Sequence, residues 1–255
     1  MENKPVSFTP PCFVINLDRS PERLTEMTQQ FSKQAIQFQR ISAVDGGTIS
    51  HTLIDQFYSK SSPLKYHKQL NNGEICCYLS HRKVWQKMVD ENIPVAIILE
   101  DDVEIVGDLN AVGNTLVAMP KDWDYIKLTE HTRRRKVIYE DDRGPFTRVI
   151  YDKIPARTCA QAVSLAGAQK LLAGSNTISR PIDIDLQYWW EKELRIFGLQ
   201  PYPVRPKADA TSEIDKLKQR RTTRKYNWLK VRQQVAFLIK NTKYVRARLA
   251  SLTNH

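Results

Sequence analysis

The most informative chemical groups in the sequence are three consecutive carboxylates, Glu100, Asp101 and Asp102. They directly follow the apolar run 94–99, whose unbroken hydrophobic character is typical of a central strand that is covered on both faces. Clustered carboxylate oxygens at the carboxyl end of such a strand are suitable ligands for Mn²⁺ or Mg²⁺ bound to a diphosphate. The triplet therefore predicts a cation site, with the alternative that it only solvates a loop or caps the next helix.

Polar side chains also follow the first predicted strand, 12–17. A Ser-Pro pair at 20–21 supplies a helix start, with serine as the cap and proline at the first helical position. Backbone N–H groups and guanidinium groups at this helix start are suited to uracil, ribose or phosphate, so Asn16, Arg19 and Arg23 are candidate ligands. The alternative for the two arginines is a set of surface salt bridges.

Two further positions carry side chains that are suited to a nucleotide site. Asp45 ends the predicted strand 38–44, where it either accepts hydrogen bonds from a ribose or uracil edge or simply begins an Asp-Gly turn. Ser80 and His81 lie on the otherwise apolar predicted helix 73–89, whose inner face is expected to carry Ile75, Leu79, Val84 and Met88. A lone histidine in such a place is more often a core residue than a ligand.

Strands and helices alternate along the chain. Segment 132–147 is polar and basic, as in a hairpin or a mobile loop. This alternation favours an α/β fold with a mainly parallel sheet, in which ligands bind outside the carboxyl ends of the strands. Apolar runs predict strands at 12–17, 38–44, 94–99, 125–128 and 162–165, and helical spacing predicts helices starting near 21, 73, 108, 166 and 181, the last continuing through 194.

Several of these segments together resemble glycosyltransferase family 25, the lipooligosaccharide and lipopolysaccharide galactosyltransferase family, which also has collagen-modifying members. The resemblance implies a GT-A-like, Rossmann-type nucleotide-sugar transferase fold. It also implies a UDP-sugar donor, usually UDP-galactose, and Mn²⁺ as the cofactor, with Mg²⁺ as the alternative. The segments that carry it, in chain order, are 13–23, 42–46, 73–81, 97–102, 122–124, 163–168 and 181–183.

The resemblance also assigns expected roles to single residues. Asp102 is the expected metal ligand with Glu100 beside it, although Glu100 stands where many sugar transferases have the first aspartate of a D-x-D motif. The residues expected to bind the nucleotide sugar are Ile15, Asn16, Leu17, Arg19, Arg23, Asp45, Gly46, Ser80, His81, Glu100 and Asp101.

Sugar transfer with inversion needs one carboxylate that removes the proton of the acceptor hydroxyl as its oxygen attacks the anomeric carbon. Asp183 lies at a predicted helix start and matches a family position, so it is the first candidate for this base. Asp185 and Asp124 are the next candidates. The alternative role for Asp183 is that of a helix N-cap.

The charge distribution sets residues 211–255 apart from the rest. The chain has 255 residues and a net charge of +11, but no acidic residue follows Asp215, while twelve lysines and arginines lie between Lys216 and Arg248. Residues 1–210 are therefore expected to form the catalytic domain, and 211–255 a basic helical tail. From Trp228 onward, apolar residues are predicted on one side of a helix and basic ones on the other, as in helices that bind anionic membrane surfaces. A helix docked on the catalytic domain is the alternative.

The expected function is an inverting hexosyltransferase that moves galactose, or alternatively glucose, from a UDP-sugar to a saccharide of lipooligosaccharide or lipopolysaccharide. The expected partners are the UDP-hexose donor, a lipid-linked saccharide acceptor and an anionic membrane surface, with no nucleic acid, because the body of the chain is close to neutral. No apolar run reaches the roughly 20 residues that cross a bilayer, and the N-terminus lacks a secretory pattern. These features predict a cytoplasmic protein, peripheral on the inner membrane face. The alternatives are the same fold acting on another acceptor, or a catalytically silent sugar-nucleotide or membrane-binding module.

Overall fold

A computed structural model describes residues 9–58, 66–129, 134–207 and 227–253 of the chain. Its centre is one eight-stranded sheet with the order β2-β1-β3-β8-β5-β9-β7-β6. Only β8 and β7 are antiparallel to their neighbours on both sides, so six of the eight strands point the same way and the sheet is mostly parallel, as predicted. The strands are β1 Cys12–Asn16, β2 Phe38–Ser42, β3 Val95–Glu100, β5 Tyr125–Lys127, β6 Val137–Arg143, β7 Phe146–Tyr151, β8 Ala160–Ser164 and β9 Ile196–Gln200.

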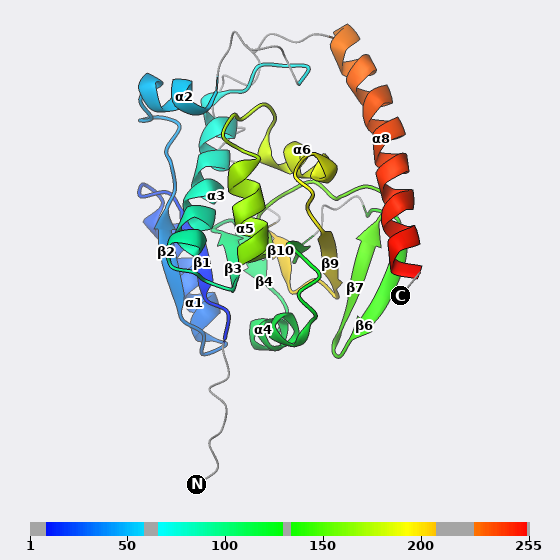
Figure 1. The fold of residues 1–255 in the computed structure, drawn as a ribbon. Helices are drawn as coiled ribbons and strands as arrows, with labels where there is room; N and C mark the ends of the chain where they lie inside the picture. The colour runs from blue at the N-terminus through cyan, green and yellow to red at the C-terminus, as the bar shows by residue number, and fades with distance from the viewer. Residues whose placement is uncertain (1–8, 59–65, 130–133, 208–226, 254–255) are drawn as a thin grey trace.

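Helices cover both faces of this sheet (Figure 1). The side chains of β3 show why, because Ala96 and Ile98 pack into one hydrophobic core and Ile97 and Leu99 into the other. The unbroken apolar run of this strand therefore belongs to a central strand that is buried on both sides, as the sequence predicts. The first core lies under α3 Asn72–Asp90, α5 Leu165–Ala173 and α6 Ile182–Gln187, and the second under α1 Pro21–Ser32 and α4 Leu109–Ala118.

The remaining short elements complete the fold. The hairpin of β6 and β7 confirms the hairpin alternative for the polar segment that begins at 132, of which residues 134 onward are described. The sequence patterns did not predict β9 or the three-residue strands β4 and β10. The other elements are α2 His51–Phe57, the two-stranded sheet of β4 Val103–Ile105 and β10 Val204–Pro206, and a 3₁₀ turn, η1, Trp189–Glu191.

The helix predicted to run from 181 through 194 is shorter than expected. It ends at Gln187, because Tyr188 leaves the helical conformation with φ −91° and ψ 39°. The following 3₁₀ turn directs Trp189 and Trp190 toward the C-terminal helix, where both rings lie 5.4–6.2 Å from the Tyr244 ring. Both tryptophans are therefore packing residues for that helix.

The C-terminal helix, α8 Asn227–Thr253, docks on the α/β unit along one side (Figure 1). Phe237 is buried, and its ring lies 5.0 Å from that of Tyr188. The amide of Asn241 donates to the backbone oxygen of Asp152 at 2.7 Å. Further along, the guanidinium carbon of Arg248 lies 4.3 Å from the Phe197 ring centre, and its burial lowers the Arg248 pKa to about 10. The described part of the tail therefore forms a helix docked on the catalytic domain, which was the alternative that the sequence left open.

The predicted placement of the apolar residues of α8 on a single face is wrong. The sequence put Val231, Val235, Leu238, Ile239, Val245 and Leu249 on one face, but the helix divides them, since Val245 packs toward the core while the first four are 52–66% exposed. The reason is that the side of α8 that faces the body is formed by Phe237, Asn241 and Val245, and the four exposed aliphatic side chains lie off that side. No described helix is both long and apolar enough to span a bilayer.

Candidate active site

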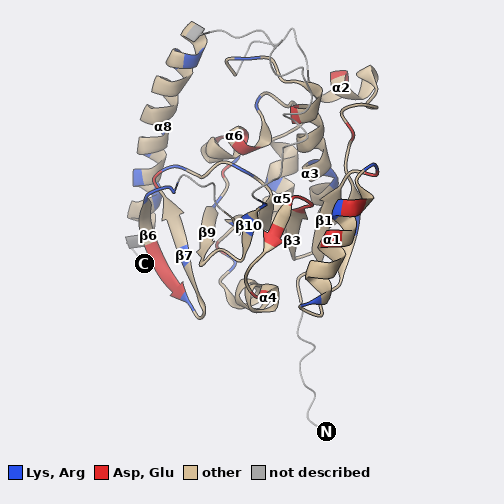
Figure 2. Ribbon diagram, turned by 180° about the vertical axis from the view of Figure 1, so that it is seen from behind, with Lys and Arg blue, Asp and Glu red and all other residues tan. Residues whose placement is uncertain are grey.

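The predicted site residues converge because β1 and β3 are parallel neighbours. Ile15 pairs with Glu100, so the loop after β1 and the acidic triplet after β3 leave the same edge of the sheet. A cavity of about 130 Å³ lies there, and a larger one of about 810 Å³ shares Arg23, Asp101 and Asp102 with it. Figure 2 shows the acidic residues of this region in red beside β3 and α1. The predicted residues that line the first cavity are Ile15, Leu17, Arg19, Arg23, Gly46, Ser80, His81, Glu100, Asp101 and Asp102.

Asn16 has a supporting position beneath this cavity. It is 1% exposed, and its amide nitrogen donates to Asp101 Oδ2 at 2.7 Å, while its amide oxygen accepts from Arg40 Nε at 2.9 Å. Arg23 Nη1 approaches the other Asp101 oxygen at 3.3 Å. Burial raises the pKa of Asp101, and the contacts with Asn16 and Arg23 act in the opposite direction. Asp101 is therefore held from beneath by Asn16 and Arg23, which orient it at the edge of the cavity.

The turn after β2 closes another side of the cavity. Arg19 Nε lies 2.9 Å from Asp45 Oδ2, and Asp45 Oδ1 accepts from the backbone nitrogen of Gly47 at 2.8 Å. A Cβ at Gly46 would lie 3.3 Å from the backbone nitrogen of Gly73, so glycine allows this turn to approach the first turn of α3 closely. Asp45 therefore both begins its turn and orients Arg19 along the cavity wall.

His81 and Glu100 form the polar floor of the cavity. His81 is 1% exposed, and its Nε2 lies 2.9 Å from Glu100 Oε1, which also accepts from Thr158 at 3.1 Å. Gln161 donates to His81 Nδ1 at 2.8 Å, and this contact leaves the ring proton on Nε2. Burial raises the pKa of Glu100, but the His81 and Thr158 hydrogen bonds dominate and lower it. Glu100 is therefore held as a carboxylate through Oε1, while its second oxygen, Oε2, here called the outer oxygen, takes part in none of the hydrogen bonds found among the described residues.

The surroundings of the Asp102 carboxylate differ from those of Glu100. Its Oδ1 is buried and has no hydrogen-bond partner among the described residues. Burial and the nearby charges of Glu100 and Asp101 raise the pKa of Asp102 to about 7, while Arg23 and Arg157 act in the opposite direction. The two arginines only partly offset the burial and the neighbouring negative charges, so this carboxylate is left short of positive charge. A divalent cation with oxygen ligands fits this deficit.

A second group of possible ligands is made of Cys77, His81 and Glu100, whose donor atoms lie within 4.8 Å of one another. Burial raises the pKa of the Cys77 thiol well above its ordinary value, and the charges of Glu100, Asp183 and Asp102 raise it further. Both ring nitrogens of His81 already make hydrogen bonds. A protonated thiol and an occupied imidazole fit a metal poorly, so Asp102 with the outer oxygen of Glu100 is the better pair for a hard cation.

Sequence patterns missed three residues near this floor. Thr158 and Gln161 support Glu100 and His81, and only the polarity of Gln161 inside the apolar strand β8 could have signalled such a role. Arg157 adopts φ 70°, a left-handed conformation that is uncommon for arginine and recurs at functional sites. Its charge lowers the pKa values of Glu100 and Asp102. Arg157 is thus a cation placed beside the carboxylates, and no local motif marks it.

The three candidate bases have different surroundings. Asp183 begins α6 and is half-buried, and burial raises its pKa, while a hydrogen bond from the backbone of Ile184 and the charge of Lys127 act in the opposite direction. Asp185 is buried and binds Tyr78 Oη and Lys192 Nζ, each at 2.6 Å. Of the two α6 carboxylates, only Asp183 has no cation bonded to it among the described contacts.

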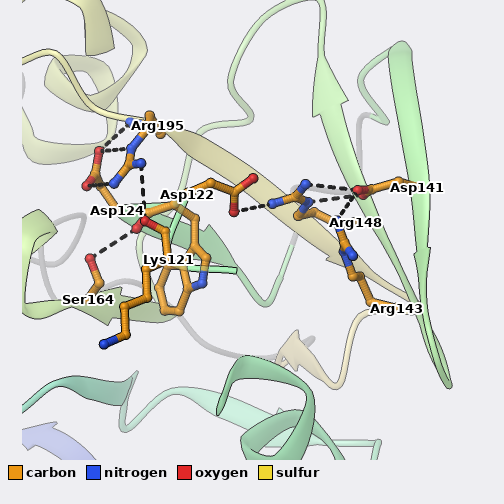
Figure 3. A network of polar contacts seen from close by, with 9 residues as sticks. Lys121, Asp122, Asp124, Asp141, Arg143, Arg148, Ser164 and Arg195 are labelled. Atoms are coloured by element: carbon orange, nitrogen blue, oxygen red, sulfur yellow. Dashed lines mark hydrogen bonds and ion pairs between the residues drawn. The ribbon is translucent and has the colours of Figure 1, made fainter. Parts of the chain in front are cut away.

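Asp124 lies at the centre of an ion-pair network (Figure 3). It is fully buried, and its oxygens contact Lys170 Nζ at 2.8 Å and Arg195 Nη2 at 2.9 Å. Burial raises the pKa of Asp124, but the Arg195 and Lys170 contacts dominate and lower it. A carboxylate held by two cations inside the protein is suited to joining β5, α5 and β9, and it is poorly placed to accept a proton from a substrate.

Replacing Asp124 with asparagine is expected to lower the free energy of unfolding by roughly 2–4 kcal/mol, because Lys170 and Arg195 lose their buried counter-charge. Urea denaturation measures this change. Asp122→Asn is the matched control, since its partner Arg148 keeps Asp141 at 2.8 Å and the loss should be much smaller. A folded Asp124→Asn protein that has lost its activity, with normal stability, would contradict the structural role.

Comparison with known proteins gives a consistent result. The model of glycosyltransferase family 25, described as an LPS biosynthesis protein family, matches residues 9–186. Human procollagen galactosyltransferase 2 is 24% identical over 76% of this chain and 34% of its own length. A glycosyltransferase 25 family member of Aedes aegypti is 31% identical over 63% of this chain and 27% of its own. The inactive glycosyltransferase 25 family member 3 of Mus musculus is 27% identical over 76% and 36%.

These relatives are much longer than the chain, which spans about a third of their length. Among solved structures, a glycosyltransferase involved in glycosylation of the major capsid of PBCV-1 aligns with a TM-score of 0.43 at 10% identity, covering 81% of this chain and 99% of that one. The family match includes the loop after β1, the turn after β2, the acidic triplet and the start of α6. It therefore covers all the segments that form the site.

Proposed function

The chain belongs to glycosyltransferase family 25, and from that membership we propose that it is an inverting hexosyltransferase. The proposed donor is UDP-galactose, with UDP-glucose as the alternative, and the proposed acceptor is a saccharide of lipooligosaccharide or lipopolysaccharide. Support for galactose comes from the relatives that are named procollagen galactosyltransferases. Support for the lipopolysaccharide acceptor comes from the family description.

The observation that carries the proposal is the buried Oδ1 of Asp102, which has no hydrogen-bond partner among the described residues. It lies at a cavity that is also lined by Arg19 from the loop after β1 and Arg23 from the first turn of α1. Arg19 and Arg23 present guanidinium groups suited to the oxygens of a diphosphate. Arg157 contributes a third positive charge near the carboxylates. An arrangement of carboxylates and arginines around one cavity is typical of sites that bind a nucleotide diphosphate together with a cation.

The residues of the site would have different roles in the transfer reaction. Asp102 and the outer oxygen of Glu100 would hold Mn²⁺ or Mg²⁺, which when bound supplies positive charge that stabilises the departing diphosphate. The arginines at the same cavity bind and orient the diphosphate. Asp183 accepts the proton of the acceptor hydroxyl while the acceptor oxygen bonds to the anomeric carbon and the bond to the diphosphate oxygen breaks.

A donor screen tests this proposal. We expect slow hydrolysis of UDP-galactose, or alternatively of UDP-glucose, that requires Mn²⁺ or Mg²⁺ and accelerates when a saccharide acceptor is added. Release of UDP gives the rate, and GDP-mannose serves as the control donor. The proposal would fail if no sugar nucleotide were hydrolysed or transferred with either cation present.

A catalytically silent sugar-nucleotide-binding module is the second candidate, because a mouse relative of similar coverage is named inactive. Such a module would bind UDP without turning over any donor. Titration calorimetry with UDP and Mn²⁺, performed beside the donor screen, separates the two candidates. The same fold acting on another acceptor, as the procollagen relatives do, would transfer the donor sugar to a different saccharide or to a hydroxylated side chain.

We also propose that α8 places the enzyme on the inner, cytoplasmic face of an anionic membrane. Its exposed side carries Trp228, Val231, Val235 and Ile239, which recur at steps of three and four residues and so form one stripe along the helix. Figure 2 shows basic residues and no acidic ones on this helix. An apolar stripe with flanking positive charge fits the boundary between anionic head groups and acyl chains. Such docking would bring a lipid-linked acceptor to the site.

Vesicle binding tests the role of the stripe. The wild-type chain is expected to co-sediment with vesicles that contain phosphatidylglycerol, and a Val235→Glu, Ile239→Glu double variant should bind at least about tenfold more weakly, because two carboxylates would enter the apolar layer. Val117→Glu is the matched control, since Val117 is 46% exposed on α4. Equal binding of the double variant and the control would contradict membrane docking through α8.

A further inference from the structure

A separate cavity lies between α8 and α6, where it is lined by Ile184, Gln187 and Tyr188. It has a volume of about 340 Å³, within the usual range for small-molecule sites. The family match ends at residue 186, so α8 lies outside it. Figure 1 shows α6 placed between α3 on one side and α8 on the other. The cavity is therefore formed partly by a helix that the family resemblance does not describe.

The walls of this cavity carry groups that suit a sugar. Tyr66, Tyr188 and Phe237 contribute aromatic rings to these walls, against which the apolar face of a sugar ring can pack. One face of the Tyr188 ring is already covered by the Arg180 guanidinium, whose carbon lies 3.7 Å from the ring centre, so a sugar would meet the remaining aromatic surface. Gln187 lines the cavity and is only 4% exposed, yet its side-chain amide takes part in none of the hydrogen bonds found among the described residues. Its N–H and C=O groups are therefore available to a molecule bound in the cavity. Gln187 thus suits a polar ligand.

The charged residues around the cavity indicate a second property of its ligand. Lys153 and Lys230 line it together with His67, and no carboxylate does so among the residues that the structure describes. Lys153 Nζ lies 4.6 Å from the Phe237 ring centre. Burial lowers the pKa of Lys153, and the charge of Arg135 lowers it further. Positive charge is therefore concentrated around the cavity, as expected for a ligand that carries a negative group.

Two stretches of chain connect this cavity with the donor site. Ile184 lines it, and the preceding residue is Asp183, whose charge reaches Cys77 in the donor cavity. Tyr66 and His67 also line it, and the chain continues from them to Gly73, which lines the donor cavity. A molecule in contact with Ile184 would therefore touch the residue that directly follows the proposed base in the chain. Leu238, which is 62% exposed at the membrane-facing side of α8, borders the same cavity.

We propose that this cavity binds a saccharide acceptor bearing an acidic group, a phosphate or a carboxylate. The tyrosine rings and Gln187 recognise the sugar, while Lys153 and Lys230 bind the anion. This inference rests on the proposed transferase function, and it specifies the acceptor class that the sequence leaves open. It also gives α8 a role in substrate binding besides its place at the membrane.

Binding of matched small sugars to the full chain, in the presence of UDP and Mn²⁺, tests the inference. Glucose 6-phosphate and glucuronate are the anionic probes, with glucose and inorganic phosphate as their controls. The anionic sugars are expected to bind about tenfold more tightly than either control, since a charge-assisted hydrogen bond is worth that much in affinity. Lys230→Gln should remove most of this preference, and Gln187→Leu should weaken both sugar probes while leaving inorganic phosphate unaffected.

Lys240→Gln is the matched control, because Lys240 is an exposed lysine of α8 that does not line the cavity. It should keep the preference for anionic sugars. Equal binding of glucose and glucose 6-phosphate, equal binding of phosphate alone, or an unchanged preference in Lys230→Gln would overturn the inference. Hydrolysis of UDP-galactose without acceptor is measured on the same samples. Its absence in the wild-type chain would refute the transferase function itself, whereas its presence without anion preference would refute only the acceptor class.

Discussion

With asparagine at position 183, hexose transfer is expected to slow by roughly 10²–10⁴-fold, the usual contribution of a positioned general base. The side-chain amide keeps the size of Asp183 but cannot accept the proton of the acceptor hydroxyl. Burial raises the pKa of Asp183 above its ordinary value, which strengthens it as a base. Initial rates with saturating donor and acceptor measure the effect, and the affinity for UDP should stay close to that of the wild type.

Asp185→Asn separates catalysis from folding in this experiment. Asp185 is buried against Tyr78, Arg180 and Lys192, so its replacement should lower the thermal midpoint while the folded fraction keeps its transfer rate. The reverse outcome, in which Asp183→Asn transfers sugar at the wild-type rate and folded Asp185→Asn does not, would assign the proton transfer to the second carboxylate of α6.

Asp102→Asn is expected to abolish cation-dependent turnover and, at the same time, to stabilise the metal-free protein. The pKa of Asp102 is raised from 3.8 to about 7 by burial and by the charges of Glu100 and Asp101, so the folded chain holds this proton more tightly than the unfolded chain does. The stability that protonated Asp102 contributes is therefore complete below about pH 4 and is lost as the pH rises toward 7. Asparagine does not ionise, so the variant avoids this loss.

The expected gain for metal-free Asp102→Asn at pH 8 is about 2–4 kcal/mol, or several degrees in the thermal midpoint, and it should shrink as the pH falls toward 4. Added Mn²⁺ should raise the midpoint of the wild type and leave that of the variant unchanged. The wild type should also bind Mn²⁺ more weakly at pH 6 than at pH 8, because protons compete for the same carboxylate. Thermal unfolding with and without EDTA measures all three effects.

Glu104→Gln is the matched control for these measurements. Glu104 lies two residues from Asp102 but is exposed and paired with Arg205 at 2.8 Å. Its replacement should give neither the pH-dependent gain nor the loss of Mn²⁺ response. A stabilised Asp102→Asn protein that still turned over its donor with Mn²⁺ would show that the cation binds elsewhere, with the Cys77, His81 and Glu100 group as the next candidate.

The sequence by itself determined the parts of the protein that depend on local pattern. The unbroken apolar run before Glu100 predicted a central strand, and burial of alternate side chains in two cores confirms it. Helical spacing predicted α3 with Ile75, Leu79, Val84 and Met88 inward, and all four are at most 5% exposed. Since parallel strands end at one edge of a sheet, the placement of the acidic triplet beside the loop after β1 also followed from the pattern.

Only the tertiary structure decided which of the polar residues are free to react. Asp124, Asp183 and Asp185 have the same chemistry in the sequence, but the fold gives the first and third partners that lie far away in the chain. Lys170 and Arg195, which contact Asp124, lie 46 and 71 residues from it, and the phenol of Tyr78, which donates to Asp185, lies 107 residues from it. The support of Glu100 by Thr158 and of His81 by Gln161 likewise spans 58 and 80 residues. Both contacts depend on β8 lying antiparallel beside β3. The direction of a strand cannot be predicted from a short apolar run in the sequence.

The C-terminal helix shows the same division. Its basic and apolar composition was evident in the sequence, which predicted one apolar face. The structure divides those residues between a side that docks on the Trp189 and Trp190 turn and a side that stays exposed. Helical periodicity specifies which residues share a face, but the surface that a face meets depends on where distant elements place their side chains. For this reason the proposed acceptor cavity beside Gln187 could be identified only from the tertiary structure.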